Sequence, residues 1–333
     1  MHCIVKKINF RLIFLFAFVV VGTLLLGNGA QAVTLIPPSL EIGLKPGAEY
    51  DTVIKLFNET SNTISLYTEV TNFSAKGETG QPEFDFGGEL IGLAKWINVE
   101  KGPIVIEPGK RYEVPVAIKT PVDADPGGHY ATLFFSSSPP EEGQLRIASK
   151  VGTLILARVD GEIKEAGSIT EFSASKKTFS SLPVEFTIRF SNSGNVHLKP
   201  TGKIAVKNIF GKETVSIDFN ASKGATLPNT VRMYQATWDK GLIIDKSGNV
   251  WSDFWQGYSN EKNNFALGKY TAELSITAGT LESVKDTAKV GFWVLPWHMM
   301  LVWGLLAVLA VLLIIFLIKK YNAWILKKAK SQQ

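Results

Sequence analysis

The stretch VEFTIRF, residues Val184 to Phe190, alternates apolar and polar side chains at every step. That period of two is typical of a strand with one face buried and the other in water. The same alternation recurs in TVIKLF, ISLYTEV and YEVPVAI, at residues 52–57, 64–70 and 112–118. Clusters of Gly, Pro, Asn and Ser separate these stretches, and no long stretch between the two ends of the chain shows helical periodicity. The sequence therefore predicts an all-β protein built of β-sandwiches.

Two parts of the chain repeat the same signals about 140 residues apart. FNETSN at 57–62 and FSNSGN at 190–195 each follow a predicted strand, and GHY at 128–130 and GKY at 268–270 each begin one. We therefore predict two tandem immunoglobulin-like sandwiches, over residues 33–165 and 166–292. The boundary is expected near Glu165-Ala166-Gly167.

The stretch PGGHYATLFF, residues 126–135, admits two interpretations: the rim of an active site, or the turn into a buried strand. Immunoglobulin-like sandwiches often carry a tyrosine near the start of a late strand, whose hydroxyl bonds back to the preceding corner. His129 in the first copy is replaced by Lys269 in the second. An exposed, interchangeable position explains that difference better than a catalytic one. We expect structural corners at Tyr130 and Tyr270.

Both ends of the chain carry membrane signals. Three basic residues, an apolar run and an Ala-x-Ala ending at Ala32 predict a signal peptide over 1–32; an uncleaved anchor is the alternative. Residues 296–318 predict a transmembrane helix, with tryptophans near its outer end. The basic tail, 319–333, predicts a cytoplasmic C-terminus. We therefore expect a single-pass protein of the bacterial cell membrane whose large domain is extracellular.

The charge distribution follows the predicted topology. The chain is +5 overall, but the predicted signal contributes three positive charges and the tail five, so the region between them is net negative. The basic balance therefore does not indicate a nucleic-acid partner. The single cysteine, Cys3, lies in the predicted signal, which excludes disulfides and thiol chemistry from the mature chain. Sequons begin at Asn58, Asn72 and Asn220, and we interpret these short patterns as chance matches.

No motif for catalysis is present. The histidines are isolated, and the chain contains no nucleophile elbow, phosphate-binding loop or zinc-protease motif. Asp123 with Asp125, and Glu141 with Glu142, lie in Pro- and Gly-rich turns where solvated carboxylates are ordinary. A calcium ion at Asp123 and Asp125 is the alternative interpretation. We predict that the protein is not an enzyme and holds no cofactor or metal.

Two aromatic features remain. Trp96 is expected inside a strand, in the core. A second group lies in a predicted loop rich in Asn, Gly, Lys and Ser, and consists of Trp251, Phe254, Trp255 and Tyr258. Exposed rings with polar neighbours stack on sugars or anchor a protein partner, which makes these four the candidate partner-binding residues. The alternative is a loop folded over its own sandwich with the rings buried.

The chain resembles the WxL-interacting cell-surface proteins of Gram-positive-type bacteria. The resemblance covers roughly residues 35–160. It rests on PSLEIGLKPG at 38–47, FN at 57–58, WINV at 96–99, IEPG at 106–109 and the double glycine at 127–128. The second half matches more loosely, through NSGN at 192–195, Pro200-x-Gly202 and Gly268-x-Tyr270. The aromatic stretch at 251–258 has no clear counterpart in the family's host-binding half. The three W-x-L tripeptides lie at or near the predicted span, at 293–295, 303–305 and 324–326.

The resemblance implies a peptidoglycan-binding first sandwich and a second sandwich that binds a protein or glycan. We therefore predict a non-catalytic, membrane-anchored surface protein that attaches to peptidoglycan or another envelope glycan, to a surface protein, or to both. The alternative is structural: a spacer, or a chaperone-like envelope assembly protein that captures subunits by sheet-edge pairing.

Overall fold

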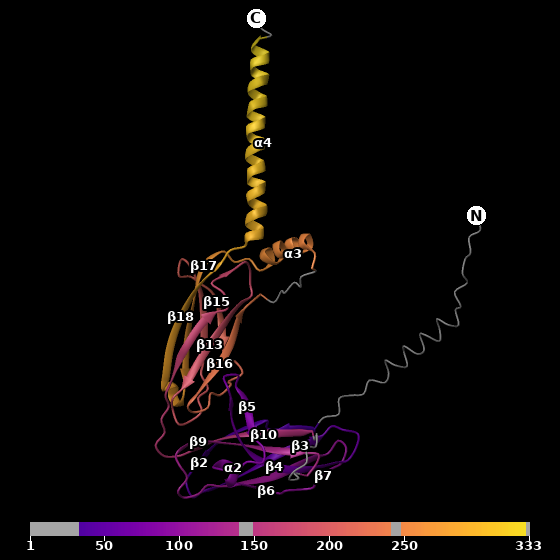
Figure 1. The fold of residues 1–333 in the computed structure, drawn as a ribbon, viewed down its shortest axis with the longest axis vertical. Coiled ribbons are helices and arrows are strands. Elements are labelled where there is room, and N and C mark those ends of the chain that lie inside the picture. The colour runs from indigo at the N-terminus through magenta and orange to yellow at the C-terminus, as the bar shows by residue number, and fades with distance from the viewer. Residues whose placement is uncertain (1–32, 140–148, 241–247, 331–333) are drawn as a thin grey trace, which may run out of the picture. The chain divides into compact units, whose positions relative to one another are not determined.

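The computed structural model describes residues 33–139, 149–240 and 248–330 (Figure 1). Contacts divide the chain into two compact units. The first holds most of the chain up to Ala157, and the second holds most of it from Arg158 onward, together with Phe73–Glu83 and Asp125–Gly128. The predicted signal peptide lies outside the described residues, so it stays a prediction.

The first sandwich is built from short strands and one helical turn. Its strands are β1 (Val33–Ile36), β2 (Ser39–Leu44), β3 (Glu49–Asn58), β4 (Ile64–Lys76), β5 (Gln81–Asp85), β6 (Ile97–Val99), β7 (Ile104–Ile106), β8 (Arg111–Lys119), β9 (Gly127–Ser136) and β10 (Lys150–Val159), with α2 at Leu93–Trp96. One sheet has the order β1-β3-β8-β6, and the other has the order β2-β10-β9-β4-β5, with β7 also pairing with β4.

The second sandwich adds helices to the same kind of framework. Its elements are β11 (Gly167–Ala174), β12 (Thr178–Phe179), β13 (Val184–Asn192), β14 (Thr201–Asn208), β15 (Glu213–Phe219), β16 (Thr230–Trp238), α3 (Val250–Asn263), β17 (Gly268–Ala278), η1 (Thr280–Glu282), β18 (Val284–Val294) and α4 (Trp297–Lys330). The sheets run β11-β13-β16 and β12-β18-β17-β14-β15.

The two sandwiches share one topology. In each, the first part of the chain contributes one strand to each sheet. After that, a strand of one sheet is twice followed by two neighbouring strands of the other: β3 by β4 and β5, and β8 by β9 and β10, in the first sandwich; β13 by β14 and β15, and β16 by β17 and β18, in the second. The strands correspond one to one in chain order, except that β6 and β7 have no counterpart among the described strands of the second sandwich. The predicted all-β fold with tandem immunoglobulin-like sandwiches is confirmed.

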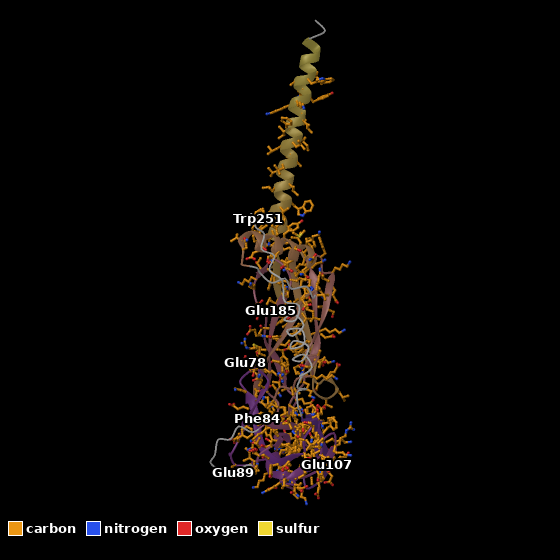
Figure 2. All side chains as sticks on the ribbon, turned by 90° about the vertical axis from the view of Figure 1, so that its right-hand side faces the viewer. Glu78, Phe84, Glu89, Glu107, Glu185 and Trp251 are labelled. Atoms are coloured by element: carbon orange, nitrogen blue, oxygen red, sulfur yellow. The ribbon has the colours of Figure 1, made fainter. Side chains whose placement is uncertain are left out.

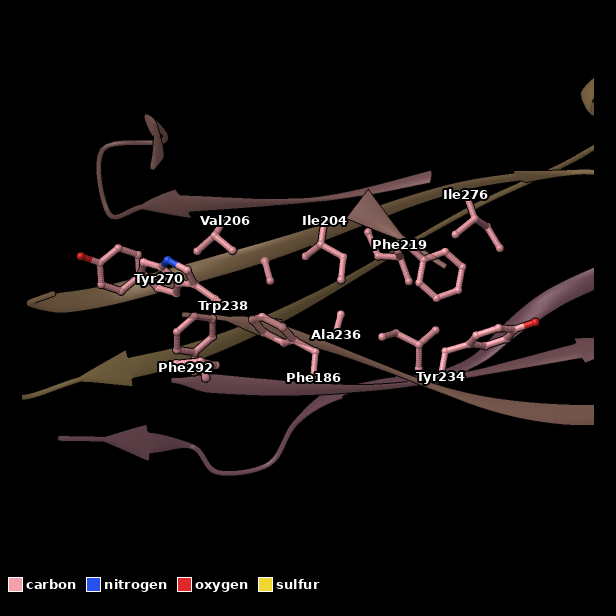
Figure 3. Packing of buried hydrophobic residues seen from close by; sticks show 14 of the residues in the cluster. Phe186, Ile204, Val206, Phe219, Tyr234, Ala236, Trp238, Tyr270, Ile276 and Phe292 are labelled. Atoms are coloured by element: carbon pink, nitrogen blue, oxygen red, sulfur yellow. The ribbon is translucent and has the colours of Figure 1, made fainter. Parts of the chain in front are cut away.

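The stretch VEFTIRF, residues 184–190, forms the centre of the second core. β13 buries Val184, Phe186, Ile188 and Phe190 and turns the residues between them outward. These side chains pack against Trp238 and Phe292 from other strands, in a core rich in edge-to-face ring contacts (Figure 3). The predicted strands at 52–57, 64–70 and 112–118 likewise lie within β3, β4 and β8.

A buried asparagine ends β3 in the first sandwich and β13 in the second. Asn58 Nδ2 donates to the carbonyls of Asn62 and Ile106, at 2.8 and 2.9 Å, and its Oδ1 accepts the N–H of Thr60. Asn192 repeats the pattern with Val196, Thr226 and Gly194. The repeat detected in the sequence is therefore real but out of register by one residue, because Asn58 corresponds to Asn192. Burial of Asn58 also removes its amide from the surface, where a sequon would need it.

The histidine of PGGHYATLFF packs as a structural residue. The ring centroid of His129 lies 4.6 Å from that of Trp96. The predicted tyrosine corner is present in the second sandwich, where the Tyr270 hydroxyl accepts the backbone N–H of Leu267 at 3.3 Å. Tyr130 takes the corresponding place at the start of β9 and is half-buried. The prediction for Trp96 was wrong: it ends the short helix α2 and is half-buried, because the strand begins one residue later.

Candidate functional site

The four predicted partner-binding aromatics lie on a helix, and the expectation of a loop was wrong. α3 runs from Val250 to Asn263, and Asn249 begins it by accepting the N–H of Trp251 through its side chain. Trp251, Phe254, Trp255 and Tyr258 follow the i, i+3, i+4, i+7 spacing of one helical face. That spacing is a helix signature, but the polar composition of the surrounding residues obscured it.

The helix brings the four rings together in one cluster. Trp251 is 69% exposed and Trp255 is 44% exposed, while Phe254 and Tyr258 are half-buried. Phe254 makes ring contacts with Trp251 and Trp255, and Tyr258 contacts Trp255. The two tryptophans are therefore available to a partner, and the alternative of fully buried rings does not hold for them.

The aromatic cluster continues into the first turn of α4. The Phe254 ring lies 6.1 Å from Trp297 and 5.2 Å from His298, centroid to centroid. Trp297 and His298 stack on each other at 3.6 Å. Figure 1 shows α3 lying across the base of α4, at the end of the sandwich from which α4 leaves.

A buried carboxylate holds α3 to α4. Glu261 on α3 is almost completely buried and accepts the backbone N–H groups of His298 and Met299, at 3.3 and 2.8 Å. Its Oε1 also lies 2.6 Å from His298 Nδ1. The first N–H groups of a helix have no partners within the helix, and a negative charge there is favoured by the helix dipole. Glu261 therefore caps α4 from a segment 37 residues earlier in the chain.

A glycine allows this close approach. A Cβ at Gly257 would lie 2.4 Å from Cε1 of His298. Glycine within a helix costs up to about 1 kcal/mol relative to alanine, so its presence here is best explained by packing. The sequence-based predictions did not include Glu261, Gly257 or His298 as parts of one site. The signal that could have pointed to them is the helical spacing of the neighbouring aromatic residues, with a glycine among them, close to the predicted span.

A hollow opens beside the contact between α3 and α4. Polar groups of Asp253, Gln256 and Asn260 line it from α3, together with Ser180, Ser181 and His298. Asn260 Nδ2 donates to Ser181 Oγ at 2.9 Å, which fixes α3 on the sandwich. This lining can bind a small polar group by hydrogen bonds.

Acidic side chains do not gather into a metal site in the described part of the chain. No group of three or more His, Cys, Asp or Glu is placed to hold a metal ion there. Asp123 and Asp125 are both exposed in the loop before β9. Glu141 and Glu142 lie outside the described residues.

A second candidate surface is the edge of a sheet. β15 pairs with β14 over Lys207–Gly202 and is the last strand of its sheet in the described structure. Its side chains alternate, with Val215 and Ile217 half-buried and Thr214, Ser216 and Asp218 exposed. An edge strand presents unpaired backbone N–H and C=O groups, to which another extended segment can bind.

α4 is long and apolar enough to cross a membrane. The qualifying stretch runs from Trp297 to Ile325; its most apolar 18 residues have a mean hydropathy of 3.2, and none of these is buried within the protein. At about 1.5 Å per residue, such a helix exceeds the roughly 30 Å of a hydrocarbon layer. The predicted span at 296–318 lies almost wholly within this helix.

No protein-family model and no curated protein matches the sequence. Solved structures that match include the class 5 fimbrial chaperone CfaA, at 12% identity and a TM-score of 0.37, with 78% of this chain and 99% of that chain covered. The Pseudomonas aeruginosa chaperone CupB2 matches at 8% identity and a TM-score of 0.35, covering 78% of this chain and 100% of that one. The E. coli chaperone DraB matches at 8% and 0.35, covering 79% and 97%. These likenesses are too distant to carry a function over to this chain.

Proposed function

We propose that the chain is a membrane-tethered, non-catalytic binding protein of the bacterial cell surface. In this proposal α4 crosses the membrane once, the sandwiches lie outside, and the lysine-rich end of the chain lies in the cytoplasm. The second sandwich captures an extended segment of a surface protein by pairing with a sheet edge. The proposal is supported by the fold, by the length and hydropathy of α4, and above all by the open edge of β15.

β15 suits this role better than the other long edges of the second sandwich. β11 packs against β18 of the opposite sheet more extensively than β15 packs against β16. The pairing of each strand with its neighbour contains one register shift, between Ile169 and Glu171 in β11 and beside Thr214 in β15. In β16, the N–H of Met233 already donates to the carbonyl of Glu78, within the same unit. β15 offers seven residues, and from Thr214 to Asp218 its side chains alternate between exposed and half-buried, which is the arrangement an added strand extends.

Site-specific photo-crosslinking tests this proposal in intact cells. A photoreactive residue at Ser216, on β15, should form adducts with a surface protein. The matched control is Ser275, which is exposed in the same sheet but lies on β17, between two paired strands. In the isolated complex, the amide protons of β15 should also exchange more slowly than in the free protein. Equal adducts at Ser216 and Ser275, without protection of β15, would contradict edge pairing.

A second candidate function is attachment to peptidoglycan by the first sandwich, as the family resemblance implies. One observation favours it: a hollow on the outer face of β3, β6 and β8, where Asp51, Asn98 and Glu100 surround an apolar floor that includes Val53 and Pro115. The carboxylate and amide groups around this apolar floor can form hydrogen bonds with sugar hydroxyls.

Co-sedimentation with isolated sacculi tests the wall-binding proposal. The full chain, in detergent, should bind saturably and tolerate added salt. Asn98→Ala combined with Glu100→Ala should weaken binding, whereas Ser216→Ala should leave it unchanged. If the chain does not sediment with sacculi, the proposed binding to peptidoglycan is refuted and the capture of a surface protein remains.

A further inference from the structure

Large apolar side chains are exposed mainly at one end of the second sandwich. We call this end, formed by the 208–212 turn, α3, the 264–267 loop and the start of α4, the α4 end. Strand register places these segments together, because Asn208 pairs with Tyr270 and Gly268 pairs with Val294. The exposed apolar residues there include Phe210 (90%), Trp251 (69%), Trp255 (44%), Phe265 (48%), Leu267 (52%) and Trp297 (50%).

The opposite end of the same sandwich differs. In the β17–β18 turn there, the exposed large apolar residue is Leu281. Scattered exposed apolar residues are ordinary on protein surfaces, but a concentration on several separate chain segments marks a docking surface. We therefore expect the α4 end to contact an occupant outside the described chain.

Continuity with α4 identifies that occupant. The apolar stretch of α4 begins at Trp297, and Trp297 belongs to the same ring cluster as Phe254 and Trp251. Tryptophan and tyrosine favour the boundary between headgroups and acyl chains. A surface that adjoins the start of a spanning helix and is rich in these rings lies at the depth of that boundary.

The outer stripe of α3 fits the same environment. Trp251, Trp255, Tyr258 and Lys262 follow the i, i+4, i+7, i+11 spacing of one helical stripe. Aromatic rings with a lysine beside them are typical of helices that lie in the membrane plane. Figure 2 shows Trp251 level with the base of α4, so the stripe begins where the apolar helix begins.

We propose that the α4 end rests in the headgroup region of the bilayer, with α3 lying in the plane of the membrane. Glu261 and Gly257 lock α3 to α4, so the second sandwich stands on the membrane as one body with its spanning helix. This inference rests on the proposed anchoring by α4. Lys212, Lys262 and Lys269 are exposed at this end, but Glu213 and Asp253 lie there too, so we assign the contact to the apolar side chains.

Nitroxide depth measurements on the full chain in nanodiscs test the proposal. The nanodiscs contain phosphatidylcholine with phosphatidylglycerol, and single cysteines are introduced in a Cys3→Ser background. Trp255→Cys and Phe210→Cys report on two separate segments of the α4 end. Leu281→Cys, equally apolar and exposed at the opposite end, is the matched control. Gly304→Cys reports whether α4 itself lies in the bilayer.

The expected result is oxygen accessibility typical of acyl chains at 304. At 255 and 210, the ratio of oxygen to nickel-chelate accessibility should be several-fold above that at 281. Suppose that position 304 is exposed to lipid but the accessibility ratios at positions 255 and 210 equal the ratio at 281. That result would overturn the inference and leave the anchoring by α4 intact. An aqueous signal at 304 would instead refute the anchoring, and the inference with it. If the nitroxide at position 255 becomes buried only after a surface protein is added, the aromatic stripe of α3 binds that protein, and the inference is overturned.

Discussion

At the scale of single residues, two buried asparagines fix the loops that follow their strands, although their sequence context does not indicate this role. Asn58 and Asn192 each satisfy two carbonyls and one N–H at the end of a paired strand. Their positions repeat between the sandwiches, whereas the residues around them differ. A buried amide with three satisfied hydrogen bonds specifies the loop that follows it, because any other loop leaves polar groups unpaired.

Asn58→Asp should destabilise the first sandwich by about 2–4 kcal/mol, since a carboxylate would face two carbonyl oxygens in place of an amide donor. Asn98→Asp is the matched control, because Asn98 is exposed on β6 of the same sandwich. Chemical denaturation of the full chain in detergent measures both variants. If Asn58→Asp lowers the free energy of unfolding no more than Asn98→Asp does, the structural role of Asn58 is contradicted.

Glu165 gives the second sandwich a dependence on pH. Burial acts to raise the pKa of Glu165, but hydrogen bonds from Ser283, Thr280 and Arg158 outweigh it and lower the pKa from 4.5 to about 2. A carboxyl whose pKa is lowered in the folded state stabilises the protein above its unfolded pKa. That stability is lost as the pH falls toward the folded value.

Solvent screens these partly exposed interactions, so we expect Glu165 to contribute about 1–2 kcal/mol above pH 4.5, and to lose this contribution between pH 4.5 and about 2. Glu165→Gln should flatten the pH dependence of unfolding in that window. Denaturation curves at several pH values measure the difference, and the two proteins should converge near pH 2. Parallel curves for wild type and variant would contradict the prediction.

At the scale of elements, the strands were predicted from the sequence and the helix α3 was missed. Alternation in VEFTIRF reflects burial within the strand itself, so the signal is local. α3 is stabilised by contacts that lie far away in the chain, such as Glu261 with the first turn of α4 and Asn260 with Ser181. Four aromatic residues at helical spacing were the local signal, and the polar residues between them led to the wrong prediction of a loop.

The candidate site shows the same division. Trp251, Phe254, Trp255 and Tyr258 could be named from composition alone, and the structure places them in one cluster. The residues that position them, Glu261 and His298, are ordinary side chains until the fold brings them together. The one-residue error in matching Asn58 to Asn192 has a similar origin, because only hydrogen bonds across strands define that correspondence.

Gly257→Ala tests whether α3 and α4 pack as one body. The added Cβ would lie 2.4 Å from the His298 ring, which Glu261 and Trp297 hold in place. We expect a cost of about 1–3 kcal/mol, which exceeds the gain of up to about 1 kcal/mol from alanine's helix propensity. Amide exchange across α3 should quicken accordingly.

Gly304→Ala is the matched control for that variant. Gly304 is also helical, and a Cβ there would meet no atom within 4 Å. Exchange in α3 should be unchanged in this variant. Slower exchange in α3 of Gly257→Ala than in wild type would show that helix propensity dominates and that the contact between the helices is loose.

At the scale of the whole molecule, the proposals depend on which side of the membrane the sandwiches occupy. α4 is compatible with a single crossing, and the lysines that follow its apolar stretch favour the cytoplasm for the C-terminus. Both the capture of a surface protein and attachment to the wall require the sandwiches to be outside.

Cysteine labelling in intact cells tests this orientation. In a Cys3→Ser background, Ser222→Cys, in the exposed turn after β15, should react with a membrane-impermeant maleimide. Ser331→Cys, beyond α4, should react only after the membrane is permeabilised, because positive charge close to a span is retained inside. The reverse pattern would place the sandwiches in the cytoplasm, where neither a wall polymer nor a surface subunit is available. Labelling at both positions would mean that α4 does not span the membrane, and would direct the search for partners to soluble proteins.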